Sequence, residues 1–210
     1  QRTVIDVLAG PGRRWEAIEA YERLRAALDD AYAAEPEPQT KALYRRLLTG
    51  GKPMPATTLH NLPTPTTSFV GRRRLLTELS TSLGRTRLLT LSGVGGVGKS
   101  RLALELARLA GVSTDFPDGV WLVELAGVQD PEVVASTVAS ALRLTLPSGP
   151  PPTAALAEQL ASRALLLIMD NCEHLLDACS ALIDEMLTRC PEIIIVATSR
   201  EPLALPAELV

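Results

Sequence analysis

Residues 93–100 read Gly93-Val94-Gly95-Gly96-Val97-Gly98-Lys99-Ser100 and fit the pattern G-x-x-x-x-G-K-S/T. Glycines let the backbone turn so tightly that its N–H groups point inward at a polyphosphate. Lys99 supplies a positive charge for the β- and γ-phosphates, and the Ser100 hydroxyl is a ligand for Mg²⁺. The stretch therefore predicts a phosphate-binding loop for a nucleoside triphosphate, and Arg101 is a further binding candidate.

The residues around this loop predict its structural context. Residues 87–91 (Arg-Leu-Leu-Thr-Leu) have the pattern of a short apolar strand, and residues 100–107 are strong helix formers. A strand, a glycine-rich loop and a helix in this order are the setting in which such loops bind phosphate.

From residue 68 onward, apolar runs alternate with helical patterns. The strand patterns cover 119–125, 165–170 and 193–197, and the helical patterns cover 130–142, 153–162 and 172–189. Apolar strands that alternate with helices are typical of a parallel sheet covered on both faces. We therefore predict an α/β fold, a three-layer P-loop NTPase of the ASCE type, with its ligand at the carboxyl ends of the strands.

Asp170 ends one predicted strand and is the candidate Mg²⁺ ligand opposite Ser100. The alternative is that it only caps the following helix. Asn171 stands where an efficient hydrolase usually has a carboxylate, and an amide cannot act as a general base. Glu173 is then the best catalytic candidate and His174 a distant second, unless both are ordinary residues of a first helical turn.

Arg200 follows the strand predicted over 193–197. If that strand lies beside the loop strand, the guanidinium would meet the γ-phosphate and sense its presence. The alternative is a surface arginine at a strand end.

Three cysteines, 172, 179 and 190, show no disulfide-framework spacing, which indicates a reducing, cytoplasmic compartment. With His174 they lack the closely paired ligands of a structural zinc site, so we interpret them as helix residues.

A net charge of −3 argues against nucleic-acid binding through bulk charge. We expect no membrane span, because no run of 18 uncharged apolar residues occurs.

Composition divides the chain into three parts. Residues 1–50 read as helix, break and helix, similar to the end of a tetratricopeptide-type array or to an ordinary helical hairpin. Residues 51–67 are rich in Pro and Thr and predict an extended linker. Residues 68–210 form the predicted nucleotide-binding domain.

Four ordered motifs closely resemble the nucleotide-binding (NB-ARC-like) region of the signal-transduction ATPases with numerous domains, in bacterial regulators related to the SARP-type transcriptional activators. The motifs are Thr67-Ser68-Phe69-Val70-Gly71-Arg72, Gly93 to Ser100, Asp170-Asn171-Cys172-Glu173-His174, and Ala197-Thr198-Ser199-Arg200-Glu201-Pro202-Leu203. The first fifty residues resemble the tail of the bacterial transcriptional activation domain of those proteins.

This resemblance implies ATP or ADP with Mg²⁺ as ligand, and a sheet in which the Arg200 strand lies between the loop strand and the Asp170 strand. It implies that Phe69, Val70, Gly71 and Arg72 pack near the adenine. It also places the final core strand and a winged-helix lid beyond Val210, a DNA-binding domain before this chain and sensor repeats after it.

We therefore expect a regulatory switch in which Lys99 and Arg200 read the γ-phosphate, with slow hydrolysis that involves Asp170 and Glu173. Partners would be the nucleotide, other domains of the same protein, DNA only through a domain absent here, and other copies in a nucleotide-dependent way. The alternatives are an interaction scaffold with a vestigial site and, least favoured, a P-loop kinase.

Overall fold

The computed structural model describes residues 20, 21, 23–25, 28, 37, 40, 59–64, 71–111 and 115–210. The described positions between 20 and 28 are helical. The remaining predictions for residues 1–50, and those for Phe69 and Val70, lie outside the described residues.

A parallel sheet forms the centre of the described part. Its strands are β1 (Leu88–Ser92), β2 (Val120–Glu124), β3 (Leu166–Asp170), β4 (Ile194–Ser199) and β5 (Glu208–Leu209). They lie in the order β2-β3-β4-β1-β5, and every pairing is parallel. The predicted α/β class is confirmed, and so is the position of β4 between the loop strand β1 and the Asp170 strand β3.

The last strand corrects one expectation. The resemblance placed the final core strand beyond Val210, but Glu208 and Leu209 already pair with Leu88 and Leu89 of β1. Because β5 is only two residues long, its sequence carries no strand periodicity that could reveal it.

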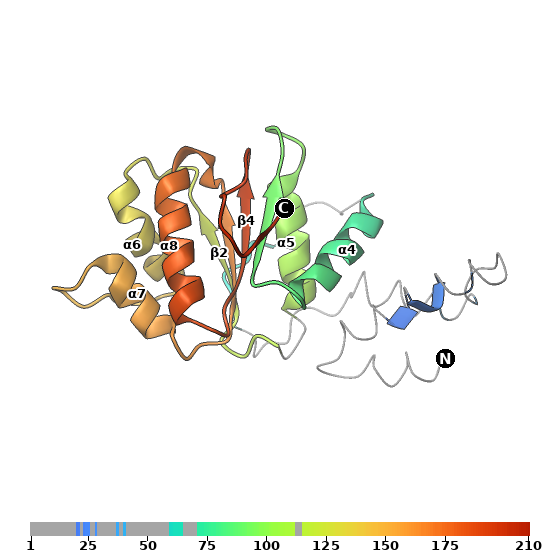
Figure 1. Cartoon of the computed structure of the whole chain (residues 1–210), viewed down its shortest axis with the longest axis horizontal. Coiled ribbons are helices and arrows are strands. Elements are labelled where there is room, and N and C mark those ends of the chain that lie inside the picture. Colours follow the sequence, from blue (N-terminus) through green and yellow to red (C-terminus); the bar gives the residue numbers. More distant parts are fainter. Residues whose placement is uncertain are drawn as a thin grey trace.

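Helices cover both faces of the sheet (Figure 1). The helices α4 (Arg73–Leu83) and α5 (Lys99–Ala110) lie on one face, and α6 (Val134–Ala141), α7 (Pro152–Leu160) and α8 (Leu176–Arg189) on the other. Each face has its own aliphatic core, with Leu106 and Ile168 in one and Leu156 and Leu167 in the other. Strands buried from both sides explain the continuous apolar runs.

Two predicted helices begin with a short 3-10 turn. Asp130 accepts a hydrogen bond from the Glu132 amide and caps the turn η1 (Pro131–Val133), which continues into α6. The helix predicted over 172–189 is divided into the turn η2 (Cys172–His174) and α8, because Leu175 has non-helical dihedral angles. None of the helices in the described part has both the length and the apolar character needed to cross a bilayer.

Part of the predicted linker is bound to the sheet. The Val120 amide donates to the Leu59 carbonyl, at 2.9 Å. The Asn61 side chain donates to the Leu122 carbonyl and accepts from the Leu122 amide, at 2.7 and 2.6 Å. Arg108 of α5 donates to the Pro63 carbonyl, at 2.7 Å. Residues 59–63 therefore lie along the edge of the sheet beside β2, with a single β-bridge between His60 and Val120, and reach α5 at Pro63. A composition rich in Pro and Thr does not reveal these contacts.

Candidate functional site

The glycine-rich loop connects β1 to α5 at the carboxyl edge of the sheet. Gly96 and Gly98 have φ of +78° and +90°, the left-handed region in which a Cβ is unfavourable. Gly98 is the N-cap of α5, and Lys99 is the first helical residue. The glycines therefore allow the chain to pass from strand to helix within six residues.

The N-terminus of α5 is open to an anion. No side chain caps it, and its first turn carries no acidic residue. The first N–H groups of a helix have no internal partners, and the helix dipole gives this end a partial positive charge. The first acid along α5 is Glu105, which is paired with Arg108 at 3.0 Å. This end of the helix is thus arranged for a phosphate.

Three cationic side chains lie against the loop. Lys99 donates to the carbonyls of Gly93 and Val94, at 2.7 and 3.2 Å. Arg72 approaches Gly98: one of its guanidinium nitrogens lies 3.7 Å from the position that a Cβ atom on Gly98 would occupy. Arg200 approaches Gly95 in the same way, with a guanidinium nitrogen 4.0 Å from the position of a Cβ atom on that residue.

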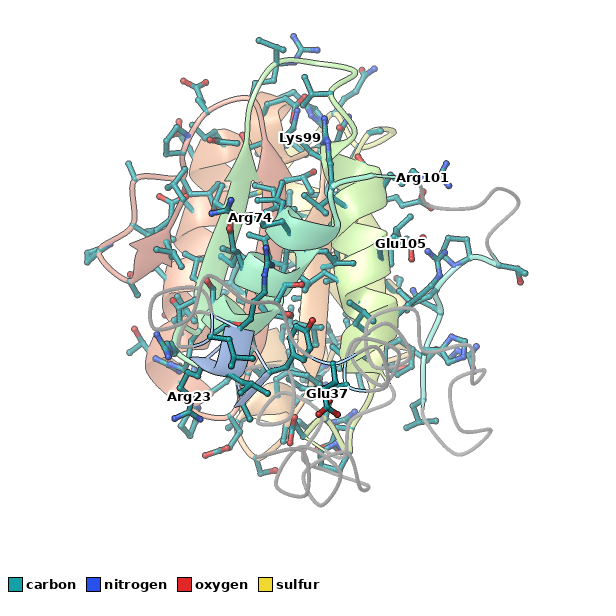
Figure 2. All side chains as sticks on the ribbon, turned by 90° about the vertical axis from the view of Figure 1, so that its right-hand side faces the viewer. Arg23, Glu37, Arg74, Lys99, Arg101 and Glu105 are labelled. Atoms are coloured by element: carbon teal, nitrogen blue, oxygen red, sulfur yellow. The ribbon has the colours of Figure 1, made fainter. Side chains whose placement is uncertain are left out.

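Arg101 behaves differently from these three. Its side chain is exposed and points to the outer side of α5, whereas Lys99 lies at the loop end of the helix (Figure 2). The structure therefore brings Arg72, Lys99 and Arg200 together at the loop and leaves Arg101 facing away from the sheet.

Asp170 lies at the end of β3, on the sheet face that α5 covers, as alternation from the buried Ile168 requires. Its Oδ1 accepts a hydrogen bond of 2.6 Å from the hydroxyl of Thr198. Among the residues that the structure describes, this is the only hydrogen bond of the Asp170 side chain. The other carboxylate oxygen is therefore available to a ligand.

A second carboxylate stands beside Asp170, and the sequence reasoning missed it. Glu124 ends β2 and pairs in register with Asp170 on the neighbouring strand, so both side chains leave the same face of the sheet. Glu124 is exposed. Adjacent carboxylates are hard oxygen donors, and so is the hydroxyl of Ser100, which lies in the first turn of the helix that covers this face of the sheet. Oxygen donors of this kind suit Mg²⁺. The residues present therefore fit this ion.

Glu173 lies in η2 and is paired with Arg200. The Arg200 Nε donates to Glu173 Oε1 at 3.1 Å, and the side chains are 69% and 14% exposed. The second oxygen, Oε2, is buried without a hydrogen-bond partner. His174, the weaker catalytic candidate, is instead bonded through Nε2 to the carbonyl of Val128, at 2.7 Å.

Two backbone positions at this edge have unusual dihedral angles. Of the four described non-glycine residues with positive φ, Arg72 (51°) and Asn171 (70°) border the loop and the acidic strand end. Such conformations persist only where surrounding contacts hold them and are common at functional sites. At Asn171 one such contact is a hydrogen bond from its amide to Thr198 Oγ1, at 3.0 Å.

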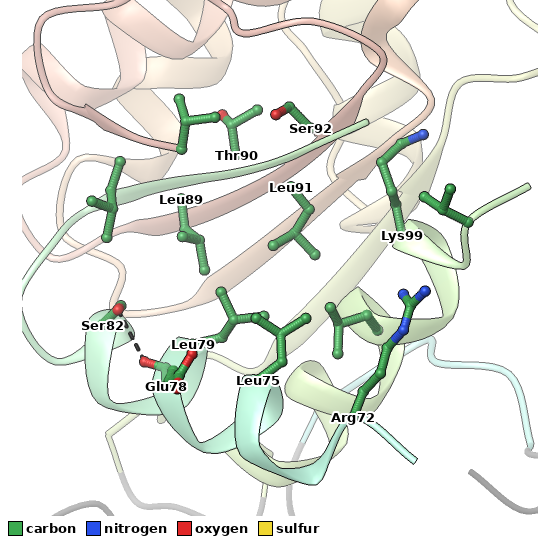
Figure 3. A pocket seen from close by; sticks show the side chains of 14 residues that line it. Arg72, Leu75, Glu78, Leu79, Ser82, Leu89, Thr90, Leu91, Ser92 and Lys99 are labelled. Atoms are coloured by element: carbon green, nitrogen blue, oxygen red, sulfur yellow. Dashed lines mark hydrogen bonds between the residues drawn. The ribbon is translucent and has the colours of Figure 1, made fainter. Parts of the chain in front are cut away.

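A pocket of about 410 Å³ opens beside the loop (Figure 3). Leu75 and Leu79 of α4 face Leu89 and Leu91 of β1 across it, and Arg72 and Lys99 lie at one end. Its size and its apolar walls suit a small organic group. Gly71, the neighbour of Arg72, is exposed with φ of +82°.

The three cysteines are free and buried. A hydrogen bond shared with Cys179, together with burial, raises the pKa of Cys172, and the charges of Asp170 and Glu173 act in the same direction. Burial also raises the pKa of Cys190. Because a metal binds the thiolate, the environments of Cys172 and Cys190 favour neutral packing groups. The hydrogen bond with Cys172 lowers the pKa of Cys179 instead.

Residues 81–205 match the family described as AAA domain, and residues 1–48 match the bacterial transcriptional activator domain. The chain is 43% identical over 127 residues to a protein named as an HTH-type transcriptional regulator in Mycobacterium tuberculosis, which covers 60% of this chain and 14% of that protein. It is 30% identical over 190 residues to the regulatory protein AfsR of Streptomyces coelicolor, covering 76% of this chain and 19% of that one. The chain thus spans less than a fifth of these relatives.

A similar solved structure is that of a STAND protein with a tetratricopeptide repeat sensor from Pyrococcus horikoshii. It aligns with a TM-score of 0.50 at 16% identity and covers 70% of this chain and 23% of that one. At this identity the likeness concerns the fold alone. The resemblance inferred from the four motifs is confirmed by these matches.

Proposed function

This chain belongs to the AAA domain family, and we propose that it is the nucleotide-binding switch module of a bacterial transcriptional regulator. In this proposal the loop of residues 93–100 binds ATP or ADP with Mg²⁺. The γ-phosphate then selects one arrangement of the neighbouring domains.

The convergence of Arg72, Lys99 and Arg200 on one loop carries this proposal. Three positive charges and an uncapped helix N-terminus surround backbone with no acidic residue between Gly93 and the first turn of α5. Such a concentration of positive potential matches a polyphosphate, and Lys99 can exchange its two carbonyl acceptors for phosphate oxygens. The apolar pocket beside Arg72 then receives the base.

Ser100 and Asp170 would hold Mg²⁺, with Glu124 beside them. When bound, the ion would neutralise charge on the β- and γ-phosphates. Asp170 is fixed through one carboxylate oxygen by Thr198, which leaves the other for the water shell of the ion.

Arg200 supports the switch part of the proposal. Its guanidinium is shared between the Glu173 carboxylate and the region of Gly95. A γ-phosphate bound at the loop would compete with Glu173 for the guanidinium, whereas ADP would leave the pair intact. A ligand can shift an equilibrium only by its differential affinity for the two states, and this exchange supplies one.

Slow hydrolysis is consistent with the state of Glu173. A carboxylate that is paired with a guanidinium is a weak general base, and Asn171 offers no replacement. We infer that the γ-phosphate draws Arg200 away from Glu173 before water can attack. Hydrolysis would then reset the switch and would not be the main activity of the protein.

The regulatory role is supported by the match of residues 1–48 and by the names of the relatives. We propose that residues 1–50 are the end of a transcriptional activator domain and that DNA is bound by another part of the whole protein. The contacts of segment 59–63 with β2 and α5 support a start of the nucleotide-binding domain before residue 68, the boundary expected from composition.

Titration calorimetry of ATP and ADP against this chain and against Lys99→Ala tests the proposal. We expect the variant to lose binding, because the Lys99 ammonium is the charge that a loop of this pattern supplies to the β- and γ-phosphates. Arg143→Ala, which removes an exposed arginine after α6, is the matched control and should bind normally. Equal affinity of Lys99→Ala and the unaltered chain would refute the site, and no binding by the unaltered chain would favour the scaffold alternative.

A further inference from the structure

Thr198 connects the two strand ends that carry the acidic and basic site residues. It is completely buried in β4, and its hydroxyl donates to Asp170 Oδ1 at 2.6 Å. The same hydroxyl oxygen accepts a hydrogen bond from the backbone amide of Asn171 at 3.0 Å. Since a hydroxyl has a single proton, its donor capacity is fully used by the Asp170 carboxylate.

The position of this hydroxyl is fixed by the sheet. Thr198 pairs with Leu91 of β1 on one side, and the neighbouring pair Met169 and Ala197 joins β3 to β4 on the other. A β-branched side chain in such a strand has little freedom at χ1. The hydroxyl is therefore held at one point, between the loop strand and the acidic strand.

Two consequences follow for the acidic strand end. The carboxylate of Asp170 cannot rotate freely, because Oδ1 is bound to a fixed donor. The left-handed backbone of Asn171, with φ of 70°, is held by the same oxygen. Removal of one hydroxyl would therefore loosen both the carboxylate and the start of the turn that carries Glu173.

We propose that Thr198 is a positioning residue for the Mg²⁺ site, which orients Asp170 so that its free oxygen faces the ion bound with the nucleotide. This inference rests on the proposed function. Thr198 would then have a task separate from the sensing of the γ-phosphate by Arg200. It acts through Asp170 and touches neither nucleotide nor metal.

The test measures ATP affinity by calorimetry in excess Mg²⁺ and in EDTA, for the unaltered chain, Thr198→Val and Thr198→Ser. Val keeps the shape of Thr without the hydroxyl, and Ser keeps the hydroxyl. We expect Thr198→Val to lose about 10- to 100-fold of the Mg²⁺-dependent gain in affinity, the usual effect of removing a group that orients a metal ligand. Its affinity in EDTA should be unchanged, and Thr198→Ser should retain most of the gain.

Matched variants keep the test decisive. Ser199→Ala removes the neighbouring buried hydroxyl, which bonds to the Glu201 amide instead, and should leave the Mg²⁺ dependence intact. Thr198→Cys keeps a buried side chain with a weak donor and should lie between Ser and Val, which serves if Thr198→Val does not fold.

The inference is overturned if Thr198→Val or Thr198→Cys keeps the full Mg²⁺ gain. It is equally overturned if affinity falls by the same factor with and without Mg²⁺, because that result indicates a general structural role. If the unaltered chain binds no nucleotide in either condition, the proposed function itself fails, and this inference fails with it.

Discussion

Arg200 Nε lies 3.1 Å from Glu173 Oε1, so the candidate phosphate sensor and the candidate general base bind each other. The other oxygen of Glu173 is buried without a partner. Neither residue can act fully while the pair exists, and a competing anion near Gly95 would separate them. In the proposed switch, phosphate sensing by Arg200 and release of the Glu173 carboxylate would therefore be one event.

Glu173→Gln should raise the ratio of ATP affinity to ADP affinity about two- to fivefold. The expected change is small because the Arg200 side chain of the ion pair is mostly exposed, and exposed ion pairs contribute little free energy. The amide no longer holds Arg200 by charge, so the γ-phosphate gains it more easily. Calorimetry with both nucleotides checks this, and Asp177→Asn, in the first turn of α8, is the control. An equal change for ATP and ADP would contradict the competition.

Glu124→Gln should weaken Mg²⁺-dependent ATP binding without changing binding in EDTA. Glu124 stands in register with Asp170, and a second negative charge at that edge attracts the cation. Glu132→Gln, which alters an exposed acid of η1, should change neither quantity. If Glu124→Gln showed the same Mg²⁺ dependence of ATP binding as the unaltered chain, the Glu124 carboxylate would lie too far from the ion to affect it.

Asn61→Ala should lower the free energy of unfolding by about 1–3 kcal/mol, because the Leu122 amide and carbonyl both lose their partner at the sheet edge. Urea unfolding checks this. His60→Ala is the control, since the exposed His60 contributes to the bridge only through its backbone. A loss of similar size in both variants would show that the Asn61 side chain is not the anchor.

Gly119→Ala should be destabilising by about 1–3 kcal/mol or more, because Gly119 has φ of +103° and an added Cβ would collide with the Leu59 carbonyl. Gly127→Ala, where a Cβ meets nothing within 4 Å, should be close to neutral. Combined with Asn61→Ala, the Gly119 loss should be less than additive, since both changes release the same segment. Strict additivity would argue against a shared contact.

Thr90→Val should raise the free energy of unfolding by about 1 kcal/mol. The Thr90 hydroxyl is buried in β1 without a hydrogen-bond partner, and Val replaces it with a methyl group of similar shape. Thermal unfolding provides the measurement. A less stable variant would mean that the hydroxyl has a partner in solution, such as a buried water.

Much of the candidate site follows from local sequence. Gly96, Gly98, Lys99 and Ser100 identify the loop because each position has a local physical requirement. Asp170 is recognisable because it ends an apolar run. The position of the Arg200 strand between the loop strand and the Asp170 strand came from the resemblance, and the sheet confirms it.

The remaining features depend on residues far apart in the chain. Thr198 has no local signal that links it to Asp170, 28 positions away, and Asn61 none that links it to Leu122, 61 positions away. Glu124 looked like the end of an ordinary strand. Only the register between β2 and β3 shows that Glu124 lies beside Asp170.

The sequence by itself determined that this chain forms a parallel α/β sheet around a glycine-rich loop, because periodicity and glycine conformation are local properties. Only the tertiary structure decided which polar and charged groups meet: Arg72 and Arg200 with the loop, Arg200 with Glu173, and Thr198 with Asp170. Hydrogen bonds and ion pairs act over a few ångströms in space, and strand register sets those distances.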